Sequence, residues 1–246
     1  MNEIIELVEA LGDYTHDPLK FVYFAFPWGE PGSLEKMNGP EEWQKDILKD
    51  IRDGVKIKDN VVREAVASGH GIGKSTLVAW LILWAISTHE NTRGVVTANT
   101  ETQLRTKTWP ELIKWYNLFI GRPLFTVTAT AIFANEPGKE KNWRIDAIPW
   151  SDNNTEAFAG LHNQGNRILM LFDEASAISN QIWEVAEGAM TDKDTEIIWC
   201  AFGNPTRNTG RFYDCFHKFR SLWNKKQVDS RSVSFSNKGL IQQWIN

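Results

Sequence analysis

The segment Gly69-His70-Gly71-Ile72-Gly73-Lys74-Ser75 limits most narrowly what this chain can fold into, because alternating glycines lead directly into a Lys-Ser pair. Residues 61–67 before it are rich in β-branched side chains and predict a strand, and the apolar run 77–86 after it predicts a buried helix. A strand, a glycine loop and a helix in this order form a phosphate-binding loop, whose backbone N–H groups converge on phosphate oxygens. The sequence therefore predicts a site for a nucleoside triphosphate.

Each part of this loop has an expected role. Lys74 is expected to reach the β- and γ-phosphates, and the hydroxyl of Ser75 to ligate Mg²⁺. The helix that begins near Ser75 directs the positive end of its dipole at the same anion. The predicted nucleotide-binding residues are Ser68, Gly69, His70, Gly71, Ile72, Gly73, Lys74, Ser75 and Thr76. The usual pattern begins with glycine, and this chain has Ser68 in that place.

Composition excludes several other classes of protein. A chain of 246 residues with 42% hydrophobic residues can fill the core of one large α/β domain. The apolar run 77–86 has about half the length of a membrane-spanning helix, and the acidic N-terminus lacks a secretory signal, so we expect a cytoplasmic protein without membrane contact. The net charge of −4 argues against a constitutive nucleic-acid binder but leaves transient contact with DNA open. Cys200 and Cys215 are expected to be buried free thiols.

A second chemical element is the apolar run 168–172, which ends in Asp173-Glu174. Such a run predicts a buried parallel strand that presents both acids at its carboxyl end. Asp173 is expected to hold Mg²⁺, and Glu174 to accept a proton from the water that attacks the γ-phosphate. The alternative is that the two acids only complement the dipole of a following helix.

Two further segments carry candidate polar contacts. A predicted strand at 196–202 ends in Gly203-Asn204-Pro205-Thr206, so Asn204 or Thr206 is a candidate contact to the γ-phosphate, although turn chemistry explains the same residues equally well. A predicted helix from 41 to about 53 carries Gln44, whose amide matches the two-sided edge of adenine. The alternative for Gln44 is an exposed polar helix residue.

The remaining segments complete an alternation of strands and helices. Trp80, Trp84, Trp109 and Trp115 fall on apolar helical faces and are expected in the core. The other expected elements are a helix at 2–11, a strand at 94–98, a helix carrying Trp109 and Trp115, a hairpin insertion at 125–148, a helix opening at 210 and a last strand at 228–235.

Four segments together resemble the ATPase half of the large terminase subunits of tailed bacteriophages. They are Trp43-Gln44, the loop 68–75, Leu171-Phe172-Asp173-Glu174-Ala175 and Gly203-Asn204-Pro205-Thr206, and the resemblance spans roughly residues 40–235. It implies an α/β P-loop fold of the ASCE type, with a mainly parallel central sheet flanked by helices. It also implies a motor that uses ATP and Mg²⁺ to move double-stranded DNA into a procapsid. The phosphate loop of that family often lacks the first glycine, in agreement with Ser68.

The resemblance also implies a role for each matching residue. Gln44 corresponds to the adenine contact, Lys74 and Ser75 to the phosphate and Mg²⁺ contacts, and Asp173 to the metal carboxylate. Glu174 corresponds to the catalytic base. Asn204 and Thr206 lie in the motif that couples hydrolysis to domain movement. The segment 97–103, followed by Trp109 and Trp115, is similar to the family as well.

The resemblance extends to domains and partners. Residues 1–60 are expected to form lead-in helices, residues 61–235 the ATPase core, and residues 236–246 the start of a linker toward an RNase H-like nuclease domain beyond Asn246. ATPase activity without DNA cleavage is the corresponding expectation. The implied partners are the portal protein, the small terminase subunit and further copies in a ring, expected to be a pentamer, at the procapsid portal in the host cytoplasm. The isolated chain is expected to be a monomer.

One departure from the family concerns positive charge. Many relatives carry an arginine inside the phosphate loop, where this chain has His70, so another cation must stabilise the transition state. Arg105, Arg167 and Arg211 are candidates, acting within the subunit or from a neighbour. The basic runs at 139–141 and 218–226 are either DNA contacts or solvated faces.

Two other functions remain open at this point. One is a helicase-like P-loop ATPase, since such enzymes share the phosphate loop and the Asp-Glu pair. The other is an assembly protein that binds ATP as a structural ligand and has no turnover of its own.

Overall fold

A single eight-stranded sheet organises the chain, and its strands follow the order β3-β4-β5-β2-β6-β7-β1-β8. The computed structural model describes residues 2–98, 100–151, 155–234, 236 and 238–239. The strands are β1 (Val61–Ser68), β2 (Arg93–Thr97), β3 (Phe125–Val127), β4 (Ala131–Ala134), β5 (Arg144–Ala147), β6 (Arg167–Phe172), β7 (Glu196–Gly203) and β8 (Asn224–Val228).

The part of the sheet from β5 to β8 is parallel, as the sequence predicts. In it, β7 lies between β1, which leads into the phosphate loop, and β6, which leads into Asp173-Glu174. The carboxyl ends of these three strands therefore meet at one edge of the sheet, where ligands bind in open α/β folds. This arrangement confirms the predicted α/β class with a mainly parallel sheet.

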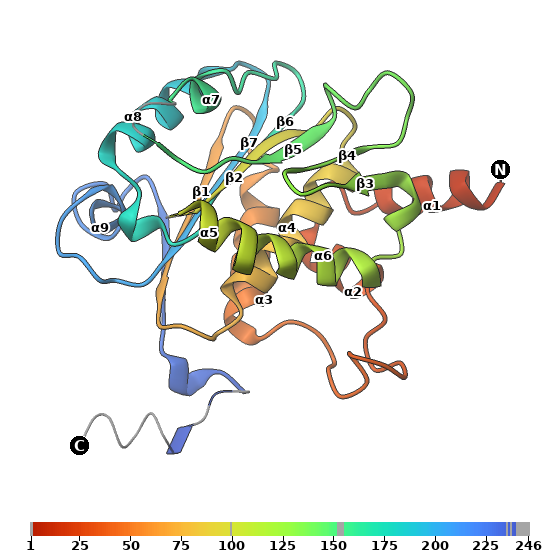
Figure 1. Ribbon diagram of the computed structural model, residues 1–246, viewed down its shortest axis with the longest axis horizontal. Coiled ribbons are helices and arrows are strands. Elements are labelled where there is room, and N and C mark those ends of the chain that lie inside the picture. Colours follow the sequence, from red (N-terminus) through yellow and green to blue (C-terminus); the bar gives the residue numbers. More distant parts are fainter. Residues whose placement is uncertain (1, 99, 152–154, 235, 237, 240–246) are drawn as a thin grey trace.

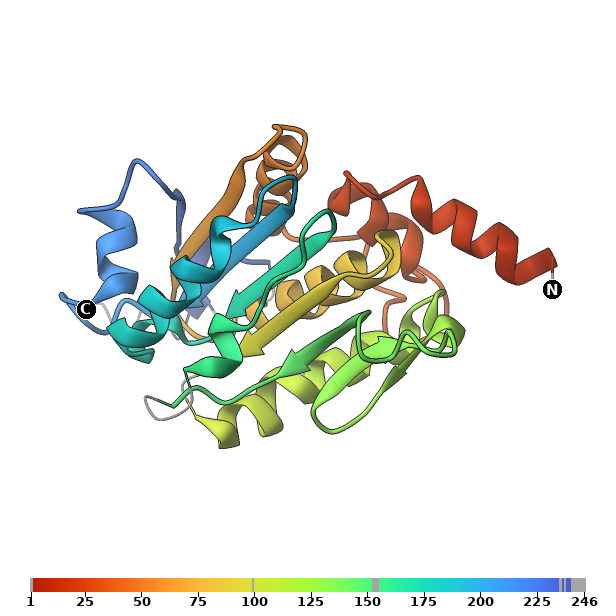
Figure 2. The same cartoon turned by 90° about the horizontal axis from the view of Figure 1, so that it is seen from above.

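Helices cover both faces of the sheet (Figures 1 and 2). They are α1 (Asn2–Gly12), α2 (Pro18–Ala25), α3 (Glu42–Gly54), α4 (Lys74–Thr88), α5 (Glu101–Gln103), α6 (Trp109–Leu118), α7 (Glu156–Ala159), α8 (Asn180–Gly188) and α9 (Arg211–Phe216). Side chains of α2, α3, α4 and α6 share one core cluster with the sheet, and those of α7, α8 and α9 share a second. The amino-terminal half of α1 projects from the body (Figure 2).

The core contains the side chains that the sequence assigns to it. Helix α4 is almost wholly buried from Leu77 to Ile86, because it lies between the sheet and other helices. The four tryptophans predicted for the core are buried, and both cysteines are buried and free. Residues of α2 and α3, such as Phe21 and Ile47, belong to the same cluster as α4. The lead-in segment thus packs onto the rest of the domain, while the boundary near residue 60 stays a prediction.

The predicted last strand at 228–235 is wrong. The structure places β8 at Asn224–Val228, followed by a short 3-10 helix at Ser230–Ser232, and Phe235 lies outside the described residues. Strand β8 forms by parallel hydrogen bonding to β1, with Val228 of β8 opposite Ser68 of β1. A polar strand at a sheet edge has no apolar alternation that could reveal it in the sequence.

The insertion at 125–148 is richer than one hairpin. Strands β3 and β4 form a tight antiparallel pair, β4 pairs antiparallel with β5, and β5 then joins β2 in parallel. Helix α2 was not predicted. The expected linker at 236–246 lies largely outside the described residues. Within the described part of the chain, no helix is long and apolar enough to cross a membrane.

Candidate active site at the phosphate loop

The phosphate loop connects the end of β1 to the start of α4. Gly71 and Gly73 adopt φ angles of 72° and 92°, in the left-handed region that glycine enters without steric cost. Ile72 between them is 1% exposed and anchors the loop in the core. The loop is therefore fixed by one buried side chain, while its glycines permit the curl that phosphate binding requires.

Lys74 is held in place from two sides. Its side chain is buried, and Nζ donates hydrogen bonds to Ser68 Oγ at 3.1 Å, to the Gly69 carbonyl at 2.7 Å and to Asn204 Oδ1 at 3.3 Å. Burial lowers the pKa of Lys74, while the charges of Glu174 and Asp173 oppose that shift. Ser68 and Gly69 thus position the cation expected to meet the phosphates.

Asp173 follows directly after β6 and is 4% exposed. Thr108 Oγ1 donates a hydrogen bond of 2.7 Å to Oδ2, and the Glu174 N–H donates to Oδ1 at 3.1 Å. Burial raises the pKa of Asp173, and the charge of Glu174 adds to this, whereas Thr108 and Lys74 act in the opposite direction. A divalent cation would favour the ionised carboxylate. The hard oxygen ligands of Asp173 and Ser75 therefore fit Mg²⁺, which protein sites bind through few side chains.

Glu174 occupies a turn that few residues other than glycine adopt, with φ 53°. The end of β7 packs against this turn. A Cβ atom added at Gly203 would lie 3.2 Å from the backbone nitrogens of both Ala175 and Ser176. The absence of a side chain at Gly203 therefore lets β7 support the turn that presents Glu174.

The loop after β7 reaches the site through Asn204. Its Oδ1 accepts from Lys74, and its Nδ2 donates to His70 Nε2 at 2.6 Å. Thr206 instead donates to Ser176 Oγ at 3.3 Å and lines a separate cavity of about 670 Å³ beside α9. The structure brings Asn204 to the phosphate loop and does not bring Thr206 there.

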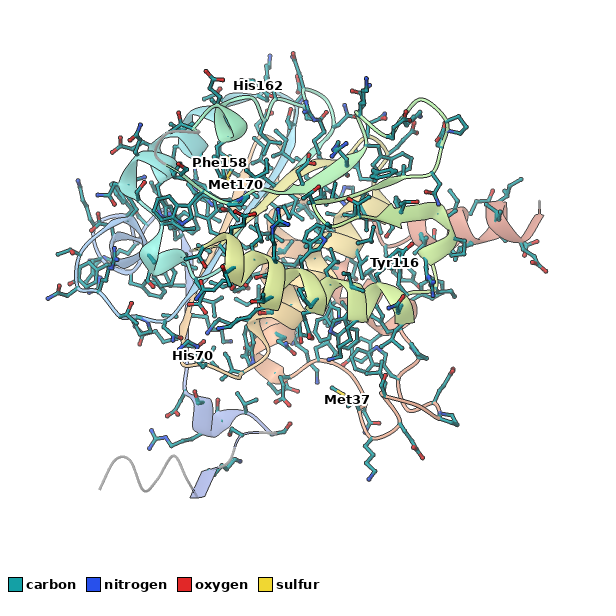
Figure 3. The ribbon with its side chains drawn as sticks, in the orientation of Figure 1. Met37, His70, Tyr116, Phe158, His162 and Met170 are labelled. Carbon is teal, nitrogen blue, oxygen red and sulfur yellow. The ribbon has the colours of Figure 1, made fainter. Side chains whose placement is uncertain are left out.

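A cavity of about 690 Å³ is lined by the phosphate loop and by Asp173-Glu174, among others, and is large enough for a nucleotide. Figure 3 shows His70 of the phosphate loop and Met37 of the loop before α3 on the same side of the molecule, and both line this cavity. The lining comprises Ser33, Leu34, Met37, Gly39, Glu41, Gln44, His70, Gly71, Ile72, Gly73, Lys74, Ser75, Thr76, Trp80, Lys107, Glu111, Lys114, Trp115, Asp173 and Glu174.

Gln44 is not the exposed helix residue of the alternative interpretation, because only 3% of it is exposed. Its Nε2 donates to the Gly73 carbonyl at 3.0 Å, and its Oε1 accepts from the Glu41 N–H at 2.9 Å. The amide thus ties α3 to the phosphate loop. One Nε2 hydrogen and one Oε1 lone pair remain for adenine, so that contact stays a prediction.

One wall of the cavity is formed by residues that the sequence patterns did not predict. A π-helical turn at Leu104–Thr108 continues into α6, and this wall presents Lys107, Glu111 and Lys114. Burial opposes ionisation of Glu111, but hydrogen bonds from Thr76 and Trp115, at 2.7 and 2.8 Å, outweigh it and lower the pKa. The spacing of Lys107, Glu111 and Lys114 indicates this wall, because residues three and four apart share one helix face.

The three arginine candidates lie outside the cavity lining. Arg167 was a wrong candidate: it is fully buried at the start of β6, where Nε donates to Glu196 Oε1 at 2.5 Å and the guanidinium covers the Trp84 ring. Arg211 pairs with Glu187 at 2.5 Å, and the exposed Arg105 pairs with Glu101 at 2.8 Å.

Comparison with known proteins agrees with this geometry. A protein described as the probable terminase large subunit of Enterobacteria phage P7 is 30% identical to the chain over 159 residues, which cover 63% of this chain and 31% of that protein. Over this matched segment the chain is similar to a phage large terminase subunit. No protein-family profile matches it.

Solved structures of large terminases share the fold. The HK97 bacteriophage enzyme has a TM-score of 0.61 at 14% identity, over 94% of this chain and 47% of that one. The enzyme of the thermophilic bacteriophage D6E in complex with ADP has a TM-score of 0.56 at 16% identity, over 83% and 50%. The ATPase domain from Thermus phage P74-26 has a TM-score of 0.54 at 14% identity, over 83% and 85%. The chain thus spans about half of the HK97 and D6E chains and most of the P74-26 domain.

Proposed function

We propose that the chain binds Mg²⁺-ATP in the 690 Å³ cavity and hydrolyses it as the ATPase part of a DNA-packaging terminase. One observation carries the proposal: Lys74 and the pair Asp173-Glu174 line the same cavity, at the edge where β1, β7 and β6 end. The D6E terminase, which shares the fold, was solved with ADP. The terminase homology favours this function over a helicase-like one.

The residues divide the chemistry among them. Lys74 and the N–H groups of the phosphate loop bind the phosphates, and Ser75 and Asp173 hold Mg²⁺, which neutralises phosphate charge. Glu174 accepts a proton from water while the water oxygen attacks the γ-phosphorus and the bond to the β–γ bridging oxygen breaks. Asn204 positions Lys74 through its 3.3 Å hydrogen bond and couples the loop after β7 to the phosphates.

The mechanical output belongs to the same proposal. Hydrolysis drives double-stranded DNA through a portal into a procapsid in the host cytoplasm, with the small terminase subunit and further copies in a ring, expected to be a pentamer, as partners. Homology to the P7 protein supports this role. The competing assembly function predicts ATP binding without turnover.

Steady-state hydrolysis of Mg²⁺-ATP, with and without duplex DNA, tests the proposal. Glu174→Gln should lower kcat by about 10²–10⁴ while ATP still binds, because it removes only a proton acceptor. Lys74→Ala should abolish ATP binding. The exposed Lys56, in the turn before β1 and far from the end of that strand, offers the charge-matched control Lys56→Ala. Unchanged ATP affinity in Lys74→Ala, or unchanged kcat in Glu174→Gln, would refute it.

A further inference from the structure

The cavity presents few positive charges to a triphosphate. Its lining contains no arginine among the described residues, and its lysines are Lys74, Lys107 and Lys114. Lys74 is held by the phosphate loop and Asn204, and Lys114 lies 3.3 Å from Glu111 Oε1 and over the Trp115 ring. Lys107 has no ion pair within the described part of the chain. Its charge is therefore available to a ligand.

The backbone of Lys107 is tied to the reacting edge of the sheet. The next residue, Thr108, is 1% exposed and donates its 2.7 Å hydrogen bond to Asp173. Both residues lie in the π-helical turn Leu104–Thr108, and such turns inside α-helices are frequent at functional sites. The turn thus places the backbone of Lys107 next to the residue that binds this carboxylate, and the Lys107 side chain and Asp173 line the same cavity.

We infer that Lys107 supplies, within its own subunit, the positive charge that stabilises the γ-phosphoryl group during its transfer. This inference rests on the proposed ATPase function. Charge builds up on the phosphoryl oxygens in the transition state, and a cation placed there in advance acts mainly on kcat. Lys107 would thereby replace the missing arginine.

The neighbouring cations fit this role less well. Arg105 and Lys107 are both exposed residues of this turn, but Arg105 lies 2.8 Å from Glu101 and does not line the cavity. Lys114 lies further along α6, 3.3 Å from Glu111 Oε1 and over the Trp115 ring, so its charge already has a partner. Of these three cations, Lys107 alone lines the cavity, lacks an ion pair among the described residues and precedes the residue that binds Asp173.

The first test compares Lys107→Ala, Lys107→Gln and Lys107→Arg with the wild type and with Lys56→Ala. For the Ala and Gln variants we expect kcat to fall by about 10²–10³ while the Kd for ATP changes by less than about threefold, because the charge acts on the transition state. Trapping of Mg²⁺-ADP with aluminium fluoride, which mimics the transferring phosphoryl group, should weaken by a similar factor. Lys107→Arg should retain trapping and turnover, and Lys56→Ala should match the wild type.

A mixing experiment decides whether the charge comes from the same subunit. Lys107→Ala retains an intact phosphate loop, and Lys74→Ala retains Lys107. If Lys107 acted on a neighbour, a mixture of the two inactive variants would regain turnover. We expect no recovery.

The failures of the two proposals are distinguishable. A wild-type chain that does not bind Mg²⁺-ATP would refute the proposed function itself. A wild type that binds ATP and traps ADP with aluminium fluoride, beside a Lys107→Ala variant that traps it equally well, would refute only the role of Lys107. Recovery of activity in the mixture, or a loss in Arg105→Ala that matches the loss in Lys107→Ala, would also overturn the inference.

Discussion

The hydroxyl of Thr108 donates a hydrogen bond of 2.7 Å to Oδ2 of Asp173, and both side chains are buried. The bond joins two segments on neighbouring strand ends, because Thr108 follows β2 through α5 and Asp173 follows β6. It fixes the rotamer of the proposed metal carboxylate from outside the metal site. The helical wall of the cavity and its acidic edge therefore form one unit.

Replacing Thr108 with valine should weaken both stability and metal use. The variant keeps the side-chain shape but leaves a buried carboxylate oxygen without its donor, which costs about 1–3 kcal/mol. Denaturant unfolding measures this loss, and the Mg²⁺ concentration for half-maximal ATPase activity should rise. Thr106→Val is the matched control, since exposed Thr106 only donates to the Thr102 carbonyl in the same turn. Equal Mg²⁺ dependence in both variants would contradict the role of Thr108.

Substitutions at Gln44 should separate its two hydrogen bonds. Gln44→Glu retains an acceptor for the Glu41 N–H but directs a carboxylate oxygen at the Gly73 carbonyl, whereas Gln44→Ala removes both bonds. We expect ATP affinity to fall in both variants, and to fall at least as far in Gln44→Glu because of the added repulsion at the loop. Equilibrium binding of a fluorescent ATP analogue measures this. Wild-type affinity in Gln44→Glu would show that the link to Gly73 does not shape the loop.

Arg167 should prove structural rather than catalytic. Its guanidinium contacts Glu196, the Thr88 hydroxyl at 2.9 Å and the Thr15 carbonyl at 2.6 Å. Arg167→Met should cost about 3–5 kcal/mol in the free energy of unfolding, because it leaves Glu196 without its buried partner. The double variant with Glu196→Gln should recover part of that loss. Urea unfolding of the wild type, the two single variants and the double variant gives the coupling energy between Arg167 and Glu196. Additive losses of stability would show that the two side chains do not interact.

The pH dependence of stability should report on Glu64. This side chain of β1 is fully buried, and its Oε1 accepts from Asn224 Nδ2 at 2.8 Å, while Oε2 has no partner. Burial raises the pKa of Glu64 to about 8, and the nearby Asp50 contributes to this. The folded state thus binds a proton that the unfolded state releases above its ordinary pKa near 4.5.

The sign follows from this difference. The contribution of Glu64 to the free energy of unfolding is fully present below pH 4.5. It is lost as pH rises to about 8, by up to about 1.4 kcal/mol per pH unit. Glu64→Gln cannot ionise, so its stability relative to the wild type should increase between about pH 5 and pH 9. Unfolding in urea across this range measures the change. A constant difference would show that Glu64 does not titrate in the folded protein.

Local patterns made much of the fold predictable. The phosphate loop, the strand before it and the strand before Asp173-Glu174 each have their signal within a short stretch of sequence, and all three occur as predicted. Strand β8 escaped prediction because its polar residues become a strand only through pairing with β1.

Several contacts of the site could not be predicted from the sequence. The hydrogen bond from Thr108 to Asp173 joins residues 65 positions apart, and nothing near either residue announces it. The sequence alone left Arg167 as a candidate for the catalytic cation, because its partner Glu196 lies on another strand. The register of β6 against β7 places the two residues side by side. Such pairings depend on tertiary contacts rather than on residue type.

The place of β7 between β1 and β6 has one more consequence. Its end touches both halves of the site, through Asn204 on Lys74 and through Gly203 beneath the turn of Glu174. Any shift of the phosphates against the proton acceptor must therefore displace a single short stretch of backbone. That stretch continues into the exposed residues 205–209, which rim the second cavity. If the two halves of the proposed site move apart during hydrolysis, the segment after Asn204 is expected to move with them.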